Sequence, residues 1–144
     1  MHFSLILTAV AALTRQASAQ DDLPGKFELA GRSGVPVMHA ALLPNGKVVF
    51  LDKLENYTES KLPTGRYAYS VEYDPATHEL FPLSLSSNAF CCGGAFLADG
   101  TLLTVGGNGP LSQLDDSIAD GFDALRYLGK GWVEYPGVHM DSRR

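Results

Sequence analysis

The chain has 144 residues, a formal net charge of −5 at pH 7 and 45% hydrophobic residues, which fits one folded domain or part of a larger one. These values exclude a multidomain machine and wholesale disorder. The sequence pI is near 5.2 and no cluster of Lys and Arg occurs. Nucleic-acid binding is therefore disfavoured, because neutralising phosphates requires a basic surface.

The N-terminus has the layout of a secretory signal peptide. Residues 3–13 form an uncharged apolar run, and Ala17, Ser18 and Ala19 supply the small residues of a cleavage site. The alternative is a buried helix or a short membrane anchor, but the run is too short to span a bilayer of about 30 Å. We predict a signal peptide at residues 1–19, a mature chain at residues 20–144, and a secreted, extracellular protein.

Asn56 begins an N-x-T sequon that runs through Tyr57 and Thr58. In a secreted protein, such a triplet indicates a glycan on a surface loop. Sequons also arise by chance, so the glycan at Asn56 depends on the signal peptide. We predict Asn56 as a glycosylation site.

Two segments of the mature chain are alike. Residues 40–52 and 94–106 each consist of an apolar run, an Asn-Gly or Asp-Gly dipeptide and a second apolar run. This pattern is typical of a β-hairpin with a two-residue turn. The turns lie at Asn45 and Asp99, which gives a repeat of 99 − 45 = 54 residues.

The offset of 54 extends beyond the hairpins, since it relates Tyr73 to Tyr127 and Phe81 to Tyr135. Each repeat then has a hairpin and two further strands, predicted at residues 37–51, 67–73 and 78–83 and again at 91–105, 122–128 and 131–135. Four short antiparallel strands in each repeat are typical of a kelch-type propeller blade. A β-sandwich would explain the strand spacing but not the constant offset.

The same offset makes Phe27 the outermost strand of a blade whose other strands do not precede it. In a closed ring, this strand would complete the last blade. We therefore predict an all-β, kelch-like β-propeller with about two four-stranded blades and an N-terminal closing strand. Propellers typically have 4 to 8 blades, so we expect residues 20–144 to be the N-terminal portion of a larger ring, an incomplete domain that requires the remaining blades.

Few residues suggest a metal or acid–base site. His39, His78 and His139 lack the spacing of metal ligands. The aspartates between residues 115 and 123 lack the spacing of a calcium loop, which favours a solvated loop. We predict no cofactor-binding or metal-binding residue in this chain.

The two cysteines, Cys91 and Cys92, are adjacent in the segment N-A-F-C-C-G-G at residues 88–94. A disulfide between neighbours closes a strained eight-membered ring, so the pair is not an obvious structural link. Either thiol fits a small buried hydrophobe or a partner for a cysteine elsewhere. The residues alone do not decide among these roles.

Four blocks, at residues 33–58, 67–75, 88–108 and 120–128, resemble the N-terminal part of secreted fungal glyoxal oxidases. These enzymes are copper-radical oxidases related to galactose oxidase. The resemblance implies a seven-bladed propeller that oxidises simple aldehydes such as glyoxal to carboxylic acids and reduces O2 to hydrogen peroxide. It also implies a copper ion beside a tyrosine that is joined to a cysteine by a thioether, with N and O ligands suited to Cu(II).

Only Cys91 matches a functional residue of that family, the crosslinking cysteine. Its tyrosine partner follows a stretch resembling residues 141–144, beyond the chain end, and the copper ligands lie further downstream. Cys92 departs from the family pattern, which has a small residue other than cysteine there.

We therefore expect an N-terminal fragment of an extracellular copper-radical oxidase, inactive alone, whose complete form uses a small aldehyde and O2. No nucleic-acid partner is expected, and no membrane after signal cleavage. The alternative is a secreted, non-enzymatic kelch-type module that binds a glycan or a protein.

Overall fold

The computed structural model describes residues 25, 27–52, 57–135 and 137–141. The predicted signal peptide at residues 1–19 and the sequon residue Asn56 lie outside them. The chain divides into two compact units, Met1–Ala30 and Gly31–Arg144. In the first unit, residues 27–30 form no strand and Phe27 is fully exposed, so the closing strand stays a prediction. Among the described residues, no helix is long and apolar enough to cross a membrane.

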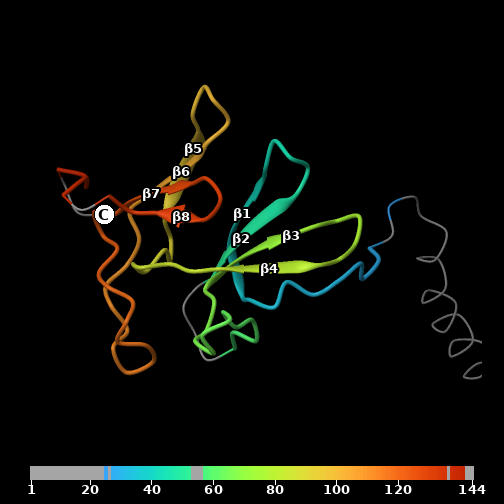
Figure 1. Ribbon diagram of the computed structural model, residues 1–144, viewed down its shortest axis with the longest axis horizontal. Coiled ribbons are helices and arrows are strands. Elements are labelled where there is room, and N and C mark those ends of the chain that lie inside the picture. Colours follow the sequence, from blue (N-terminus) through green and yellow to red (C-terminus); the bar gives the residue numbers. More distant parts are fainter. Residues whose placement is uncertain (1–24, 26, 53–56, 136, 142–144) are drawn as a thin grey trace, which may run out of the picture. The chain divides into compact units, whose positions relative to one another are not determined.

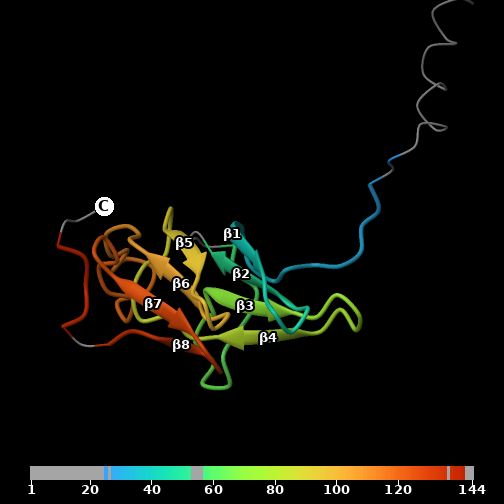
Figure 2. The ribbon, with the colours of Figure 1, turned by 90° about the horizontal axis from the view of Figure 1, so that it is seen from above.

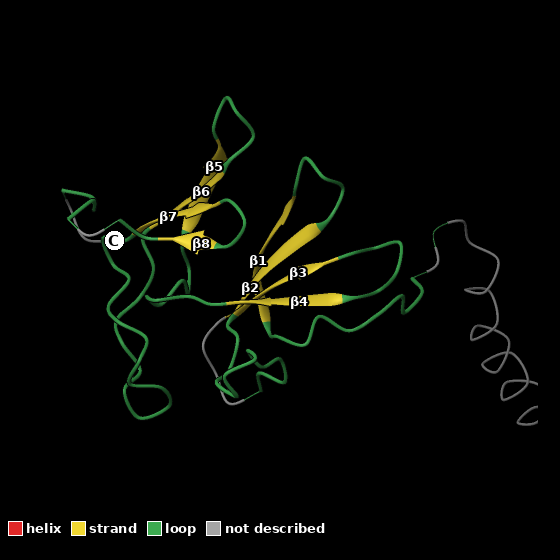
Figure 3. Cartoon of the chain, viewed as in Figure 1, coloured by secondary structure: helices red, strands yellow, loops and turns green. Residues whose placement is uncertain are grey.

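The second unit contains two four-stranded antiparallel sheets, and its described residues include no helix (Figures 1 and 3). Both sheets follow chain order, as Figure 2 shows from above. Sheet 1 consists of β1 (Val37–Leu42), β2 (Val48–Asp52), β3 (Ser70–Tyr73) and β4 (Leu80–Leu83). Sheet 2 consists of β5 (Gly93–Phe96), β6 (Leu102–Val105), β7 (Leu125–Leu128) and β8 (Trp132–Val133). The predicted four strands in each repeat are confirmed.

The hairpin turns are longer than predicted. In β1–β2, the Leu43 N–H donates to the Lys47 carbonyl at 2.8 Å, and the Gly46 N–H donates to the Leu43 carbonyl at 3.0 Å. Gly46 has a φ of +82°. This is a three-residue loop with glycine in the left-handed position, not a two-residue turn. The β5–β6 hairpin repeats the arrangement, with Gly100 in the glycine position at a φ of +85°.

The repeat offset changes by one residue in the third strand. Val48 pairs with Tyr73, whereas Leu102, 54 positions after Val48, pairs with Leu128. The offset is therefore 54 in the hairpins and 55 in β7, because Val48 and Tyr73 are 25 positions apart whereas Leu102 and Leu128 are 26 apart. In β8 the register pairs Val133 with Tyr127 as Phe81 pairs with Glu72, so Phe81 corresponds to Val133 and its predicted equivalence with Tyr135 is wrong. The predicted equivalence of Tyr73 and Tyr127 is wrong by one position, and Tyr127 corresponds in register to Glu72.

The two sheets bury opposite faces of equivalent strands. Val49 and Leu51 of β2 join Leu102 and Leu128 of sheet 2 in one core cluster. In β6, the equivalent of Val49 is Leu103, which is only half-buried. Trp132 Nε1 of sheet 2 donates to Ser70 Oγ of sheet 1 at 2.9 Å.

At their contact, the two sheets therefore use opposite faces. The face with which sheet 2 packs on sheet 1 is not the equivalent of the face with which sheet 1 packs on sheet 2. The equivalent of sheet 1's buried face lies on the other side of sheet 2, outside the core cluster, and consists of Leu103, Val105, Leu125, Tyr127 and Val133. We call these residues the open face of sheet 2. Val133 is 42% exposed there.

Candidate functional site

The two ends of the sheets differ in loop length. At one end, tight turns such as those at Gly46 and Gly100 join the strands. At the other end lie the long connections, whose described residues are 57–69, 84–92 and 106–124. Long loops on a rigid scaffold are the usual place for function. Both cysteines directly precede β5 and lie at this long-loop end.

The structure separates the two cysteines, both of which are free thiols. Cys91 is exposed, in a turn, with a φ of +61°. Cys92 is 2% exposed and belongs to the core cluster. Burial raises the pKa of the Cys92 thiol above its ordinary 9.0, although the nearby Arg126 charge opposes the shift. Cys92 is therefore a protonated, inert core residue, and Cys91 is the accessible thiol.

The segment before Cys91 is held by a buried arginine that the sequence did not reveal. Arg126, in the middle of β7, is 0% exposed. Its Nε donates to Ser87 Oγ at 2.9 Å, its Nη1 to the Gly106 carbonyl at 2.7 Å, and its Nη2 to the Asn88 carbonyl at 3.2 Å. Burial lowers the pKa of Arg126, and the Glu134 carboxylate opposes that shift. The only sequence signal was one cation within an otherwise apolar strand pattern.

Glu134 completes this network just after β8. Its Oε1 lies 3.6 Å from Arg126 Nε and accepts the Ser86 and Ser87 N–H groups, each at 3.2 Å. Its Oε2 accepts the Ser87 hydroxyl proton at 2.6 Å. Ser87 Oγ therefore accepts from Arg126 and donates to Glu134.

Two glycines leave room for the Asn88 carbonyl. A Cβ at Gly107 would lie 1.9 Å from that oxygen, and one at Gly121 would lie 2.0 Å from it. Gly107 also has a φ of +156°. The positive φ of Gly107 by itself favours glycine. The close approach of another backbone segment is the further reason for glycine here.

Two curated plant proteins are similar to this chain. "Aldehyde oxidase GLOX" of Vitis pseudoreticulata is 36% identical over 103 residues, which cover 60% of this chain and 20% of the relative. "Aldehyde oxidase GLOX1" of Arabidopsis thaliana is 31% identical over 144 aligned residues, which cover 85% of this chain and 22% of the relative. The chain is similar to plant aldehyde oxidases. It spans about a fifth of their length.

These relatives support the predicted resemblance to glyoxal oxidases. They are plant proteins, whereas the sequence blocks resemble fungal enzymes. No family model matches the chain, and no solved structure matches it. The likeness to aldehyde oxidases therefore depends on the relatives.

The histidines stay apart. Tyr73 Oη lies 2.5 Å from His78 Nδ1, and His139 Nδ1 lies 3.9 Å from an Asp123 carboxylate oxygen. Among the described residues, no three His, Cys, Asp or Glu side chains gather as a possible metal site.

Asp115 is more ordered than the predicted solvated loop. Its carboxylate accepts the Tyr69 hydroxyl at 3.2 Å and bonds from Ser117. Burial alone would raise the pKa of Asp115, but the bonds from Ser117 and Tyr69 outweigh it and lower the pKa. Asp115 thereby ties the loop after β6 to Tyr69, which directly precedes β3 of sheet 1.

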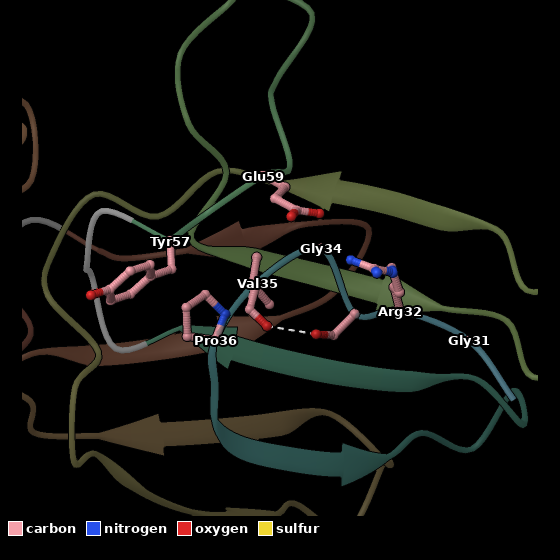
Figure 4. Close-up of a pocket in the computed structure, with 8 residues that line it drawn as sticks. Gly31, Arg32, Gly34, Val35, Pro36, Tyr57 and Glu59 are labelled. Carbon is pink, nitrogen blue, oxygen red and sulfur yellow. Dashed lines mark hydrogen bonds between the residues drawn. The ribbon is translucent and has the colours of Figure 1, made fainter. Parts of the chain in front are cut away.

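A surface pocket of about 350 Å³ lies beside sheet 1, lined by Gly31, Arg32, Ser33, Gly34, Val35, Pro36, Tyr57 and Glu59 (Figure 4). The Ser33 hydroxyl donates to the Val35 carbonyl at 2.6 Å, shown as a dashed line in Figure 4. Glu59 and Ser60 N–H groups donate to the Gly34 carbonyl, each at 2.9 Å. The pocket presents a guanidinium, a carboxylate and a phenol, but neither cysteine.

Proposed function

We propose that this chain forms two blades of an extracellular copper-radical oxidase of the glyoxal oxidase type. Such an enzyme converts RCHO, H2O and O2 into RCOOH and H2O2, with simple aldehydes such as glyoxal as substrates. The observation that carries the proposal is Cys91, an exposed thiol at the long-loop end, in a chain similar to plant aldehyde oxidases.

In this proposal, Cys91 forms a thioether with a tyrosine outside the chain. The S–H bond and one ring C–H bond are replaced by a C–S bond, and O2 takes up the two electrons and two protons released. The exposure of Cys91 supports this role, because its sulfur can reach a ring from a further part of the protein. Cys92 is a poor alternative, since its thiol is 2% exposed in the core.

Further blades are part of the proposal. The open face of sheet 2 corresponds to the face that sheet 1 buries, so a third sheet can pack on it as sheet 2 packs on sheet 1. Continued around an axis, this stacking gives a propeller. We propose that these blades supply the copper ligands and that the chain alone is inactive. Secretion through residues 1–19 and a glycan on Asn56 belong to the same proposal.

The test uses the longer protein that we propose contains this chain, loaded with copper. Peptide mapping by mass spectrometry is expected to find Cys91 joined to a tyrosine peptide, with the loss of two hydrogens. Cys91→Ser is expected to abolish aldehyde-dependent peroxide production, whereas the matched Cys92→Ser retains it. A freely alkylatable Cys91 in active, copper-loaded enzyme would overturn the proposal. Stoichiometric copper binding with peroxide production by the 144-residue chain alone would overturn the claim that it is inactive.

The second candidate is a secreted kelch-type module that binds a glycan without catalysis. The pocket beside Arg32, Tyr57 and Glu59 favours it, because a phenol and charged groups around a hollow can stack on and hydrogen-bond to a sugar (Figure 4). This candidate predicts saturable glycan binding that Arg32→Ala and Tyr57→Ala weaken, with Cys91 unmodified. If the wild-type protein binds no glycan and carries a thioether at Cys91, this second candidate is excluded.

A further inference from the structure

We propose that Arg126, oriented by Glu134, is a positioning residue for Cys91. Its guanidinium fixes the turn at residues 88–92, here called the Cys91 turn, against the end of β6. The inference rests on the proposed function, because only there is the Cys91 sulfur a reacting atom that must meet a ring at a defined place.

The arginine's hydrogen bonds run to two different segments of the chain. Its three donors bond to Ser87 Oγ, the Asn88 carbonyl and the Gly106 carbonyl. Ser87 and Asn88 lie four and three residues before Cys91, and Gly106 directly follows β6. One planar group therefore joins the approach to the Cys91 turn to a strand that is part of sheet 2.

A short, hydrogen-bonded path leads from Asn88 to Cys91. Asn88 is 1% exposed, and its Oδ1 accepts the Phe90 N–H at 3.0 Å, while its Nδ2 donates to the Gly109 carbonyl at 2.7 Å. The Cys92 N–H then donates to the Ala89 carbonyl at 3.1 Å. The segment from Asn88 to Cys91 therefore has little conformational freedom. This segment sets the position of Cys91 Sγ.

Glu134 orients the arginine and also binds the segment before Cys91. Its carboxylate accepts the Ser86 and Ser87 N–H groups and faces the arginine, so it holds both the cation and the segment that the cation binds. A buried ion pair is a weak source of net stability, because desolvation offsets the attraction. Sheet 1 fills the equivalent position with Val71, also 0% exposed. A buried side chain at this position does not have to be charged. The charge of Arg126 is therefore explained by the geometry that its hydrogen bonds impose.

The experiment compares Glu134→Ala with Glu134→Gln in the 144-residue chain. The alanine variant loses the acceptors for Ser86, Ser87 and Arg126, whereas glutamine keeps one acceptor oxygen. Glu72→Ala is the matched control, because Glu72 pairs with Lys47 at 2.9 Å on sheet 1. The measurements are residue-resolved hydrogen exchange and the alkylation rates of Cys91 and Cys92, at conditions of equal folded fraction.

Glu134→Ala is expected to raise exchange at the Asn88, Phe90 and Cys92 amides about tenfold and to increase Cys92 alkylation, because the turn opens locally. Exchange in β1, β2 and β3 stays unchanged, glutamine restores part of the protection, and Glu72→Ala leaves the turn unaffected. A uniform change across both sheets, no change at the turn, or the same effect from Glu72→Ala would overturn the inference. If Glu134→Ala fails to fold, Arg126→Lys takes its place, and an unchanged turn in that variant would also overturn it.

The longer, copper-loaded protein supplies the second measurement. Thioether yield at Cys91 is expected to fall about tenfold in Glu134→Ala and to recover partly in Glu134→Gln, for the same local opening. If the thioether yield of Glu134→Ala equals that of crosslinked wild type, the positioning role is overturned and the proposed function is not. An absent thioether in wild type overturns the proposed function instead, while hydrogen exchange still decides whether Arg126 orders the turn.

Discussion

The third strands of the two sheets solve the same burial problem in different ways. Val71 of β3 and Arg126 of β7 occupy equivalent register positions, opposite Phe50 and Thr104, and both are 0% exposed. Valine fills its site by packing alone. Arginine fills its site by binding two carbonyls and a hydroxyl. Equivalent positions in a repeat therefore share burial without sharing chemistry.

The difference follows from the neighbouring loops. In sheet 2, the segment at residues 86–88 and the turn after β6 bring backbone carbonyls toward the β7 position. Buried carbonyls need donors, and a guanidinium offers five in a fixed plane. The polar solution thus belongs to the sheet whose long-loop end carries Cys91. The comparison indicates that repeat 2 is specialised at that end.

The strongest test of the comparison replaces each of the two residues in a separate variant. Arg126→Met removes the cation beside the Glu134 carboxylate and one donor from each of the Gly106 and Asn88 carbonyls, so we expect a loss of about 4 kcal/mol in the free energy of unfolding. Val71→Ala removes only packing and is expected to cost about 2 kcal/mol. Urea denaturation measures both. An Arg126→Met variant as stable as wild type would show that the guanidinium is dispensable and that the two positions are alike.

The second test adds one methyl group beside the Asn88 carbonyl. Gly121→Ala would place Cβ 2.0 Å from that oxygen and 2.7 Å from Arg126 Nη2, and we expect a loss of about 3 kcal/mol. Gly129→Ala is the control, because nothing lies within 4 Å of a Cβ there. Its expected effect is about 0.5 kcal/mol or less. Equal urea midpoints for the two variants would contradict the close approach.

A third test concerns the contact between the sheets. Trp132 Nε1 donates to Ser70 Oγ at 2.9 Å, which joins β8 of sheet 2 to β3 of sheet 1. A double-mutant cycle with Trp132→Phe and Ser70→Ala is expected to give a coupling energy of about 1 kcal/mol. Additive effects in the cycle would mean that this bond does not help to hold the two sheets together.

Local pattern predicted the strands well, because hairpins depend on near neighbours. Asn45-Gly46 and Asp99-Gly100 marked both hairpins, and the offset of 54 holds for the hairpin strands but not for β7 and β8. The turn type was wrong, since the dipeptide does not distinguish a two-residue turn from a three-residue loop with glycine in the left-handed position. The one-residue slip in β7 was missed because loop length carries no repeat signal.

The site was less predictable, because its groups meet only through long-range pairing. Arg126 and Ser87 are 39 positions apart, and no sequence pattern links them. The two cysteines had open roles until one proved exposed and the other buried. Side-chain direction at a turn with a positive φ cannot be read from strand alternation, which fails outside strands.

Asp115 gives the smallest expected effect. It is a further residue whose long-range contact, here with Tyr69, no sequence pattern predicted. Its bonds from Ser117 and Tyr69 hold its pKa below the ordinary 3.8 in the folded state. A lowered folded pKa contributes stability that is present above pH 3.8 and is lost as pH falls through the folded value. Wild type is therefore expected to exceed Asp115→Asn in urea midpoint at neutral pH, with a gap that narrows as the pH falls below 3.8. The exposed neighbour Asp116→Asn serves as the control, and a gap that is constant with pH would show that the carboxylate does not anchor the loop to Tyr69.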